Sequence, residues 1–213
     1  IDPEVPFYEA SGMQMLGKWL MGTILHTPFF EEAGAFYKIS RPVRNPSGMV
    51  SFSPVFVPKE GVTLGFLPLT PRQILVQAFK LHGSRYGWGG LKEGRDCSSF
   101  LRDTFLTMGV TLPRNSGPQS KIGTILPKED LPQSPPAVSF VKLDGHIMLY
   151  LGEIEGRPYV IHALAGYREP GALGLKERVI NTFRVLVSDM TLGQGSKRGS
   201  LWDRTLSVNI PFQ

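Results

Sequence analysis

The strongest constraint on the fold lies at Thr70-Pro71, where the pattern of apolar residues changes from one period to another. Before this point, short apolar segments alternate with Pro, Gly and Asn residues that form turns. After it, apolar residues recur at helical spacing, with Thr70 suited to cap a helix and Pro71 to occupy its first turn. We therefore predict two domains, residues 1–69 and residues 70–213.

The first domain is predicted to be a small, barrel-like β module. Its apolar segments are short, and Gly or Pro residues lie between them. The predicted strands are residues 22–27, 35–40, 49–57 and 65–69.

The second domain begins with helices and continues with strands. One helix is predicted to start at Pro71 and to stop by Gly83, and another to run from Cys97 to Met108, with Gly109 as its stop signal. Helices followed by an antiparallel sheet predict an α+β domain. The predicted strands of this sheet are residues 137–143, 146–151 and 158–163.

Composition excludes several classes of protein. Apolar residues make up 41% of the chain and charged residues 19%, which excludes a disordered chain. Lys18 and His26 interrupt the most apolar stretch, so no membrane span is expected. Because the chain starts at Ile1 without a leader, we expect a processed product or a fragment. A further N-terminal domain or segment outside this chain is a candidate partner.

The net charge of +5 favours anionic partners. An anionic cell-wall polymer fits this charge. The chain has no Lys/Arg-rich run with interleaved aromatic residues, so we do not expect a nucleic-acid partner.

Cys97 is the single cysteine, which excludes an internal disulfide. It lies where a Gly-rich loop leads into the predicted helix, beside unpaired N–H groups and the positive end of the helix dipole. This placement favours a thiolate, and the same N–H groups would stabilise an oxyanion. Cys97 is therefore a candidate nucleophile, although a free cysteine is also a common buried core residue.

His146 and His162 lie on two predicted strands joined by a polar turn. A hairpin centred near Ile154 would place the two histidines directly opposite each other, on the same face of the sheet. His146 would then act as the base toward Cys97, with His162 orienting its ring. Two alternatives remain open: buried core histidines, or a zinc site made with Cys97.

Several motifs together resemble the NlpC/P60 family of papain-like cell-wall peptidases, from about Pro71 to the end of the chain. They are Tyr86-Gly-Trp88-Gly89-Gly90, Arg95-Asp96-Cys97-Ser98-Ser99-Phe100, Leu112-Pro113-Arg114-Asn115-Ser116, Gln119, Asp144-Gly145-His146 and Ile161-His162-Ala163. The resemblance implies a catalytic trio of Cys97, His146 and His162 that needs no metal or other cofactor. Residues 20–69 look like the bacterial SH3-type barrel that precedes this domain in γ-D-glutamyl-diamino-acid endopeptidases.

The resemblance also implies residues that contact the substrate. Asp96 would pair with the free amino group of a terminal L-Ala, or else serve only as the cap of its helix. Ser98 and Ser116 match polar positions that contact the substrate, and each is also an ordinary turn or cap residue. Arg114 would meet a carboxylate, of the substrate or of a neighbouring side chain.

Two aromatic residues, Tyr86 and Trp88, are expected to line the cleft rather than to pack in the core.

The reaction that the resemblance implies is thiolate attack on the amide between γ-D-Glu and a diamino acid, usually meso-diaminopimelate, in a peptidoglycan stem peptide. Such an enzyme is expected at the cell wall or in the periplasm, or in the cytoplasm if it recycles wall fragments. The alternatives are an amidase or acyltransferase of the same fold, and a wall-binding module with an inert cysteine.

Overall fold

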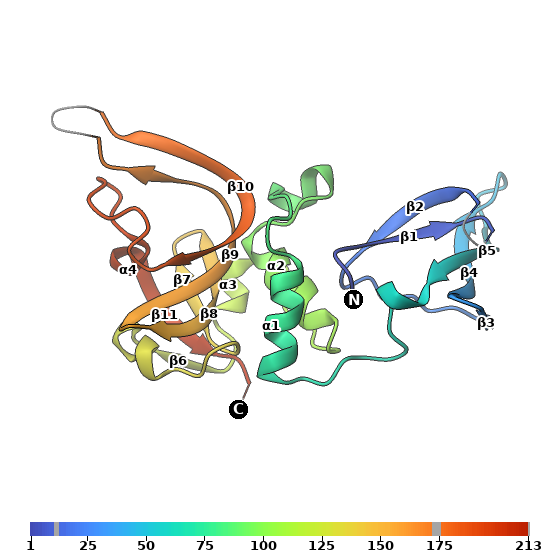
Figure 1. Ribbon diagram of the computed structural model, residues 1–213, viewed down its shortest axis with the longest axis horizontal. Coiled ribbons are helices and arrows are strands. Elements are labelled where there is room, and N and C mark those ends of the chain that lie inside the picture. The colour runs from blue at the N-terminus through green and yellow to red at the C-terminus, as the bar shows by residue number, and fades with distance from the viewer. Residues whose placement is uncertain (11–12, 172–175, 213) are drawn as a thin grey trace. The chain divides into compact units, whose positions relative to one another are not determined.

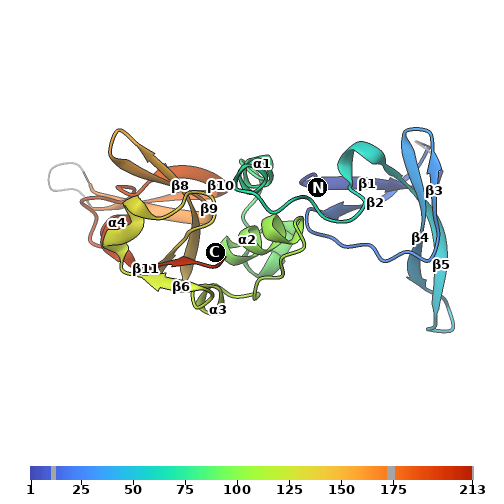
Figure 2. The ribbon, with the colours of Figure 1, turned by 90° about the horizontal axis from the view of Figure 1, so that it is seen from below.

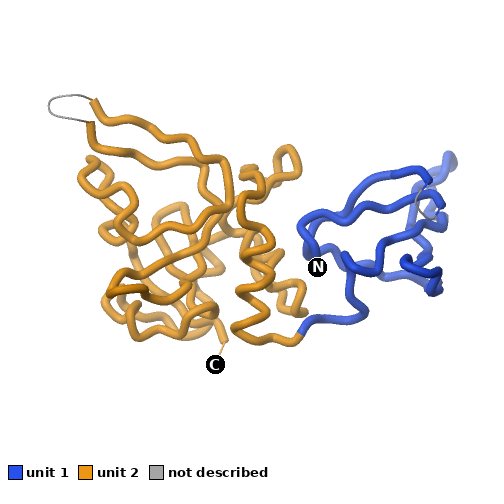
Figure 3. The backbone as a smooth tube through the Cα atoms, viewed as in Figure 1, with its two compact units in different colours: residues 1–67 blue, residues 68–213 orange. Residues whose placement is uncertain are grey.

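The computed structural model describes residues 1–10, 13–171 and 176–212. It separates into two compact units, residues 1–67 and 68–213 (Figure 3). Among the described residues, no helix is long and apolar enough to cross a membrane.

Unit 1 contains an antiparallel sheet of five strands in the order β2-β1-β5-β4-β3. A small apolar core stabilises this sheet. In this core the rings of Phe7 and Trp19 stack, with their centroids 4.1 Å apart. The elements are β1 (Glu4–Tyr8), β2 (Met15–Leu20), β3 (Phe30–Ala33), β4 (Phe36–Arg44), β5 (Val50–Pro58) and the short 3-10 helix η1 (Lys59–Gly61).

Two of the four predicted strands in unit 1 are wrong. Residues 22–27 and 65–69 form no strand, whereas the other two segments correspond to β4 and β5. The incorrect segments are apolar, but they pair with no neighbour and leave side chains such as Ile24 and Phe66 exposed. Within the described residues, no pairing joins the edge strands β2 and β3, so the sheet is not closed into the expected barrel.

The helices of unit 2 begin where the capping signals predict. The Thr70 side chain accepts a hydrogen bond from the Gln73 N–H at 3.2 Å, and Pro71 occupies the first turn, where its missing N–H costs nothing. The helices are α1 (Pro71–Lys80), α2 (Cys97–Leu106), α3 (Ser116–Gln119), α4 (Leu201–Arg204) and the 3-10 segments η2 (Trp88–Glu93) and η3 (Lys128–Gln133).

The sheet of unit 2 is antiparallel, with its strands in the order β10-β9-β8-β7-β11-β6. Its three central strands are the predicted ones, and the α+β fold is therefore confirmed. Sequence analysis missed the other three strands. The bounds are β6 (Thr124–Leu126), β7 (Phe140–Leu143), β8 (His146–Ile154), β9 (Arg157–Glu169), β10 (Arg178–Asp189) and β11 (Thr205–Ile210).

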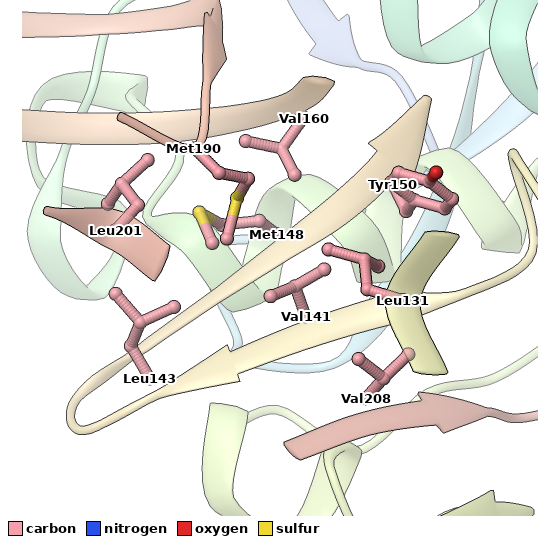
Figure 4. Close-up of a cluster of buried hydrophobic side chains, with 9 residues drawn as sticks. All are labelled: Leu131, Val141, Leu143, Met148, Tyr150, Val160, Met190, Leu201 and Val208. Atoms are coloured by element: carbon pink, nitrogen blue, oxygen red, sulfur yellow. The ribbon is translucent and has the colours of Figure 1, made fainter. Parts of the chain in front are cut away.

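Both faces of the central strands are covered. One face carries the apolar cluster drawn in Figure 4, which comprises Leu131, Val141, Leu143, Met148, Tyr150, Val160, Met190, Leu201 and Val208. On the other face, Phe140 of β7 meets Phe105 of α2 edge to face, with ring centroids 5.3 Å apart. Helix α2 packs on β8 and β9, and α1 packs on α2 (Figures 1 and 2). This packing holds the start of α2 beside the start of β8.

Candidate active site

Cys97 is the first residue of α2, where a capping box fixes the start of the helix. The Asp96 carboxylate accepts a hydrogen bond from the Ser99 N–H at 2.8 Å, and the Ser99 hydroxyl accepts one from the Asp96 N–H at 2.9 Å. Among the described residues, no group accepts a hydrogen bond from the N–H of Cys97. Cys97 exposes 8% of its surface, so its sulfur lies just below the surface.

Asp96 is held mainly by groups of its own chain. Arg114 donates to both carboxylate oxygens, at 3.0 and 2.6 Å, and the Gly89 N–H and Ser98 hydroxyl donate at 3.1 Å each. Burial alone would raise the pKa of Asp96, but these hydrogen bonds and those from Ser99 lower it to about 2. The geometry therefore supports the capping role, and binding of a substrate amine by Asp96 stays a prediction.

The protonation of Cys97 differs from the expected thiolate. Burial raises the pKa of the thiol above its ordinary value of 9.0 and outweighs the N–H groups of Ile147 and Ser98, which favour the thiolate. Asp96 raises the pKa further, and Lys142 lowers it. The resting chain therefore carries a neutral thiol at pH 7.

The structure brings His146 and His162 together. Nε2 of His146 lies 2.7 Å from Nδ1 of His162, and Nε2 of His162 lies 3.1 Å from the Ser188 hydroxyl on β10. The three side chains form one continuous chain of hydrogen bonds. If Nδ1 of His146 is the basic nitrogen, each Nε2–H donates to the next member of this chain, and one tautomer satisfies all three residues.

The predicted register of the histidine hairpin is wrong, although the contact it predicted exists. The turn lies at Glu155-Gly156 rather than near Ile154, and a β-bulge leaves Leu151 without a partner. Past this bulge, His162 lies opposite Met148 and diagonal to His146. Side chains two residues apart share a face, so the rings still meet.

The bulge at Leu151 determines whether the two histidine rings lie on the same face of the sheet. Near the turn, Gly152 pairs with Tyr159, and that register continued along the strands would place the two histidines on opposite faces. Beyond the bulge, Tyr150 pairs with Val160, and this shift of one residue returns both rings to one face.

Burial also keeps both imidazoles neutral. It lowers the pKa of His146 to about 3, helped by the positive charges of Arg204, Lys142 and Arg198. It lowers the pKa of His162 well below its ordinary range, with the charge of His146 as a second cause. A neutral imidazole can accept a proton, so His146 is in the form that a general base requires.

The backbone of β8 next to His146 contacts the sulfur of Cys97. The Ile147 N–H, directly after His146, donates to the sulfur. In the described residues, no hydrogen bond joins the sulfur to either histidine, and no group of three or more His, Cys, Asp or Glu side chains is placed to hold a metal ion.

The predicted substrate contacts lie around Asp96 and Cys97. The Ser98 hydroxyl is buried between Asp96 and Arg114, whereas the Ser116 hydroxyl is 3.4 Å from Nζ of Lys142. Ser98 is therefore occupied by its own chain. Ser116 faces a lysine that sequence analysis did not select.

The two predicted aromatic residues have different environments. Trp88 exposes 73% of its surface, which excludes a core role for it. Tyr86 is partly covered and packs at 6.4 Å from the Phe183 ring. Burial is the main cause that raises the pKa of Tyr86, followed by negative charge on Cys97 and on Asp96.

Sequence analysis missed Lys142 and Ser188. Neither lies in a motif, and Ser188 belongs to a strand that was not predicted. Only the pairing of Lys142 with Ile147, and of β10 with β9, brings them to the site.

Comparisons with known proteins cover the part of the chain that carries this site. The model of the NlpC/P60 family matches residues 83–169. Over 77 residues, the chain is 36% identical to a γ-D-glutamyl-L-lysine dipeptidyl-peptidase of Bacillus cereus. The aligned region covers 33% of this chain and 23% of that protein. It is 35% identical over 72 residues to a probable endopeptidase NlpC homolog of Haemophilus influenzae, covering 33% of this chain and 38% of that protein. The chain therefore spans well under half the length of these relatives.

Solved structures share the fold. An NlpC/P60 endopeptidase from Photobacterium damselae subsp. piscicida superposes with a TM-score of 0.73 at 20% identity, over 99% of this chain and 52% of the other. An NlpC/P60 family protein from Bacillus cereus gives a TM-score of 0.63 at 18% identity, over 98% of this chain and 60% of the other. The stretch that the NlpC/P60 family model matches, residues 83–169, contains Cys97, His146 and His162.

Proposed function

We propose that this chain is a cysteine peptidase that hydrolyses the amide between γ-D-Glu and a diamino acid in peptidoglycan stem peptides. The observation that carries the proposal is the 2.7 Å contact between the rings of His146 and His162, next to a cysteine at the start of a helix. The similarity to a γ-D-glutamyl-L-lysine dipeptidyl-peptidase supports the choice of bond. This substrate implies action at the cell wall or in the periplasm.

In the first step, the neutral thiol of Cys97 attacks the scissile carbonyl carbon. Its proton passes to Nδ1 of His146 as the bond from sulfur to carbon forms. His162 accepts the Nε2–H of His146 and so favours the imidazolium that results. The N–H of Cys97, at the start of α2, is suited to stabilise the oxyanion.

The imidazolium then donates its proton to the departing amine, the carbon–nitrogen bond breaks, and an acyl-enzyme remains. In the second step, His146 takes a proton from water, which attacks the thioester. The carbon–sulfur bond breaks, the acid is released, and the thiol regains its proton. The histidine thus returns to its neutral form.

Unit 1 fits an SH3-like role in the same proposal. It has a compact five-stranded antiparallel sheet with its own core, although the sheet remains open at β2 and β3 in the described part. We assign this unit to the bacterial SH3-like domains that precede such peptidases.

The test uses L-Ala-γ-D-Glu joined to either meso-diaminopimelate or L-Lys, with the amino end free or acetylated. Mass analysis of the products is expected to show release of L-Ala-γ-D-Glu or its acetylated form. Cys97→Ala and His146→Gln should each lower kcat/KM by at least about 1000-fold, because the nucleophile and its base act as one unit. His82→Gln changes an exposed histidine and is the matched control.

The same assay separates the alternatives. Transfer of the acyl group to an added amine in preference to water would identify an acyltransferase. Full activity in Cys97→Ala would contradict the proposal. Binding of peptidoglycan without cleavage of either peptide would identify a wall-binding module.

A further inference from the structure

Lys142 is a half-buried cation beside the nucleophile. It lies on β7, opposite Ile147 of β8, and its Nζ is 3.4 Å from both the Ser116 hydroxyl and the His146 carbonyl oxygen. Burial lowers the pKa of Lys142, while the negative charge of Asp144, and that of Cys97 once it loses its proton, raise it. Because Ile147, the strand partner of Lys142, donates its N–H to the sulfur, the ammonium group lies on the part of the sheet next to the nucleophile.

Lys142 has no carboxylate partner in the described part of the chain. By contrast, Arg95 pairs with Asp103 at 2.9 Å, and Arg114 pairs with Asp96 at 2.6 Å. The two contacts of Lys142 are long, and both partners are neutral oxygens. Such hydrogen bonds compensate for little of the hydration that the ammonium group loses on burial. A partly desolvated ammonium with such weak partners is suited to bind an anion.

Two further cations surround the same site. Arg204 and Arg198 join Lys142 in lowering the pKa of His146, and neither arginine forms a salt bridge within the described residues. Asp144 attracts both Lys142 and Arg204, so it offsets part of this positive charge. The field at the histidines still favours a negatively charged substrate.

We propose that Lys142, with the Ser116 hydroxyl as a second donor, binds the free α-carboxylate of the D-Glu residue. The inference rests on the proposed function. A γ-linked D-Glu keeps its α-carboxylate, which the two side-chain methylenes and the α-carbon separate from the scissile carbonyl. Arg114 is less suited to this role because Asp96 occupies its guanidinium.

The proposal makes Lys142 a determinant of specificity. Some stem peptides carry an amide at this carboxyl, which removes the charge without changing the shape much. An enzyme that binds this carboxylate through its charge should cleave the free acid faster than the amide, because the amide leaves the Lys142 ammonium without an anion.

The experiment compares L-Ala-γ-D-Glu-diaminopimelate with the same peptide amidated at the α-carboxyl of D-Glu. For the unchanged chain, we expect kcat/KM to be about 10- to 100-fold higher for the free acid. Lys142→Met should bring this ratio close to one, and Lys142→Arg should restore much of it. Lys38→Met removes a lysine from an exposed ion pair in unit 1 and should leave the ratio unchanged.

The ratio separates binding from an effect on the thiol. Lys142 also lowers the pKa of Cys97. If this were the only role of Lys142, its loss would slow cleavage of both peptides by the same factor, and the ratio of their kcat/KM values would not change. A second measurement avoids the thiol altogether. In the Cys97→Ala background, Lys142→Met should weaken binding of L-Ala-γ-D-Glu about 10-fold or more, and binding of the amidated dipeptide little.

Three outcomes would overturn the inference. They are equal cleavage of both peptides by the unchanged chain, an unchanged ratio in Lys142→Met, and a dipeptide affinity that does not depend on Lys142. Each of these leaves the proposed function standing. Failure to cleave either peptide would overturn the proposed function and this inference with it.

Discussion

Cys97 and His146 are both neutral in the resting chain, for the same physical reason. Burial penalises the charged form of each group, which raises the pKa of the thiol and lowers that of the imidazole to about 3. Proton transfer from one to the other is therefore part of the attack on substrate, rather than complete beforehand. The sequence signal of a helix start indicated the opposite charge state, because burial cannot be derived from a capping pattern.

This charge state predicts the reactivity of the free thiol. Alkylation of Cys97 by iodoacetamide should be slow at pH 7 and should rise about tenfold per pH unit until above pH 9, following the thiolate fraction. The measurement is the rate of mass increase from pH 6 to 10, with Cys97→Ser as the unlabelled control. A rate that is already constant below pH 7 would show a resting thiolate instead.

Ser188 predicts a second effect at the scale of a residue. Because its hydroxyl is 3.1 Å from Nε2 of His162, Ser188→Ala should leave that buried nitrogen without a partner and lower kcat about 3- to 10-fold. Ser188→Thr keeps the hydroxyl and should retain most of the activity. An equal loss in both variants, or a change in KM alone, would assign Ser188 a structural role.

The hairpin of β8 and β9 is the element that assembles the site. Its type I′ turn has positive φ at Glu155 (52°) and Gly156 (71°), and the bulge farther along has Gly152 at 107°. The turn aligns the strands, and the bulge then shifts them by one residue. Without this shift, the histidines would lie on opposite faces of the sheet.

The bulge predicts a large effect from a small change. A Cβ at Gly152 would meet Pro136 at 3.3 Å and would require a strained backbone, so Gly152→Ala should destabilise unit 2 by about 1–3 kcal/mol. We expect activity to fall further than stability alone explains, because the register of His146 depends on this bulge.

The turn supplies the control for that variant. Glu155→Asn relieves a positive φ at the tip and should raise stability by about 0.5 kcal/mol without changing activity. Urea denaturation and peptide cleavage measure both effects. Normal activity in folded Gly152→Ala would show that the bulge does not set the register.

At the scale of the whole molecule, the chain consists of two compact units, and the candidate site lies within the second. His146 and His162, whose pKa values burial lowers, couple the stability of that unit to pH. In the unfolded chain each histidine gains a proton below about pH 6.5, whereas in the folded chain His146 does so only near pH 3.

The sign of this coupling follows directly. Protons bind the unfolded chain first as the pH falls, so the stabilisation is complete above pH 6.5 and is lost toward pH 3. The slope should approach about 1.4 kcal/mol per pH unit for each histidine. Urea denaturation between pH 7 and pH 4 measures it, with His162→Gln expected to flatten the curve and His82→Gln to leave it unchanged. A slope that does not change in His162→Gln would contradict this account.

The sequence alone determined the local features of this protein: where α1 and α2 begin, the central strands of the second sheet, and the candidacy of Cys97, His146 and His162. Capping residues and apolar periodicity act over a few neighbouring residues, so they can be recognised without the fold. The bulge at Leu151, the approach of Lys142 and Ser188, the open sheet of unit 1 and the neutral thiol required the tertiary structure. Strand pairing and burial depend on residues far apart in the chain, which local patterns do not specify.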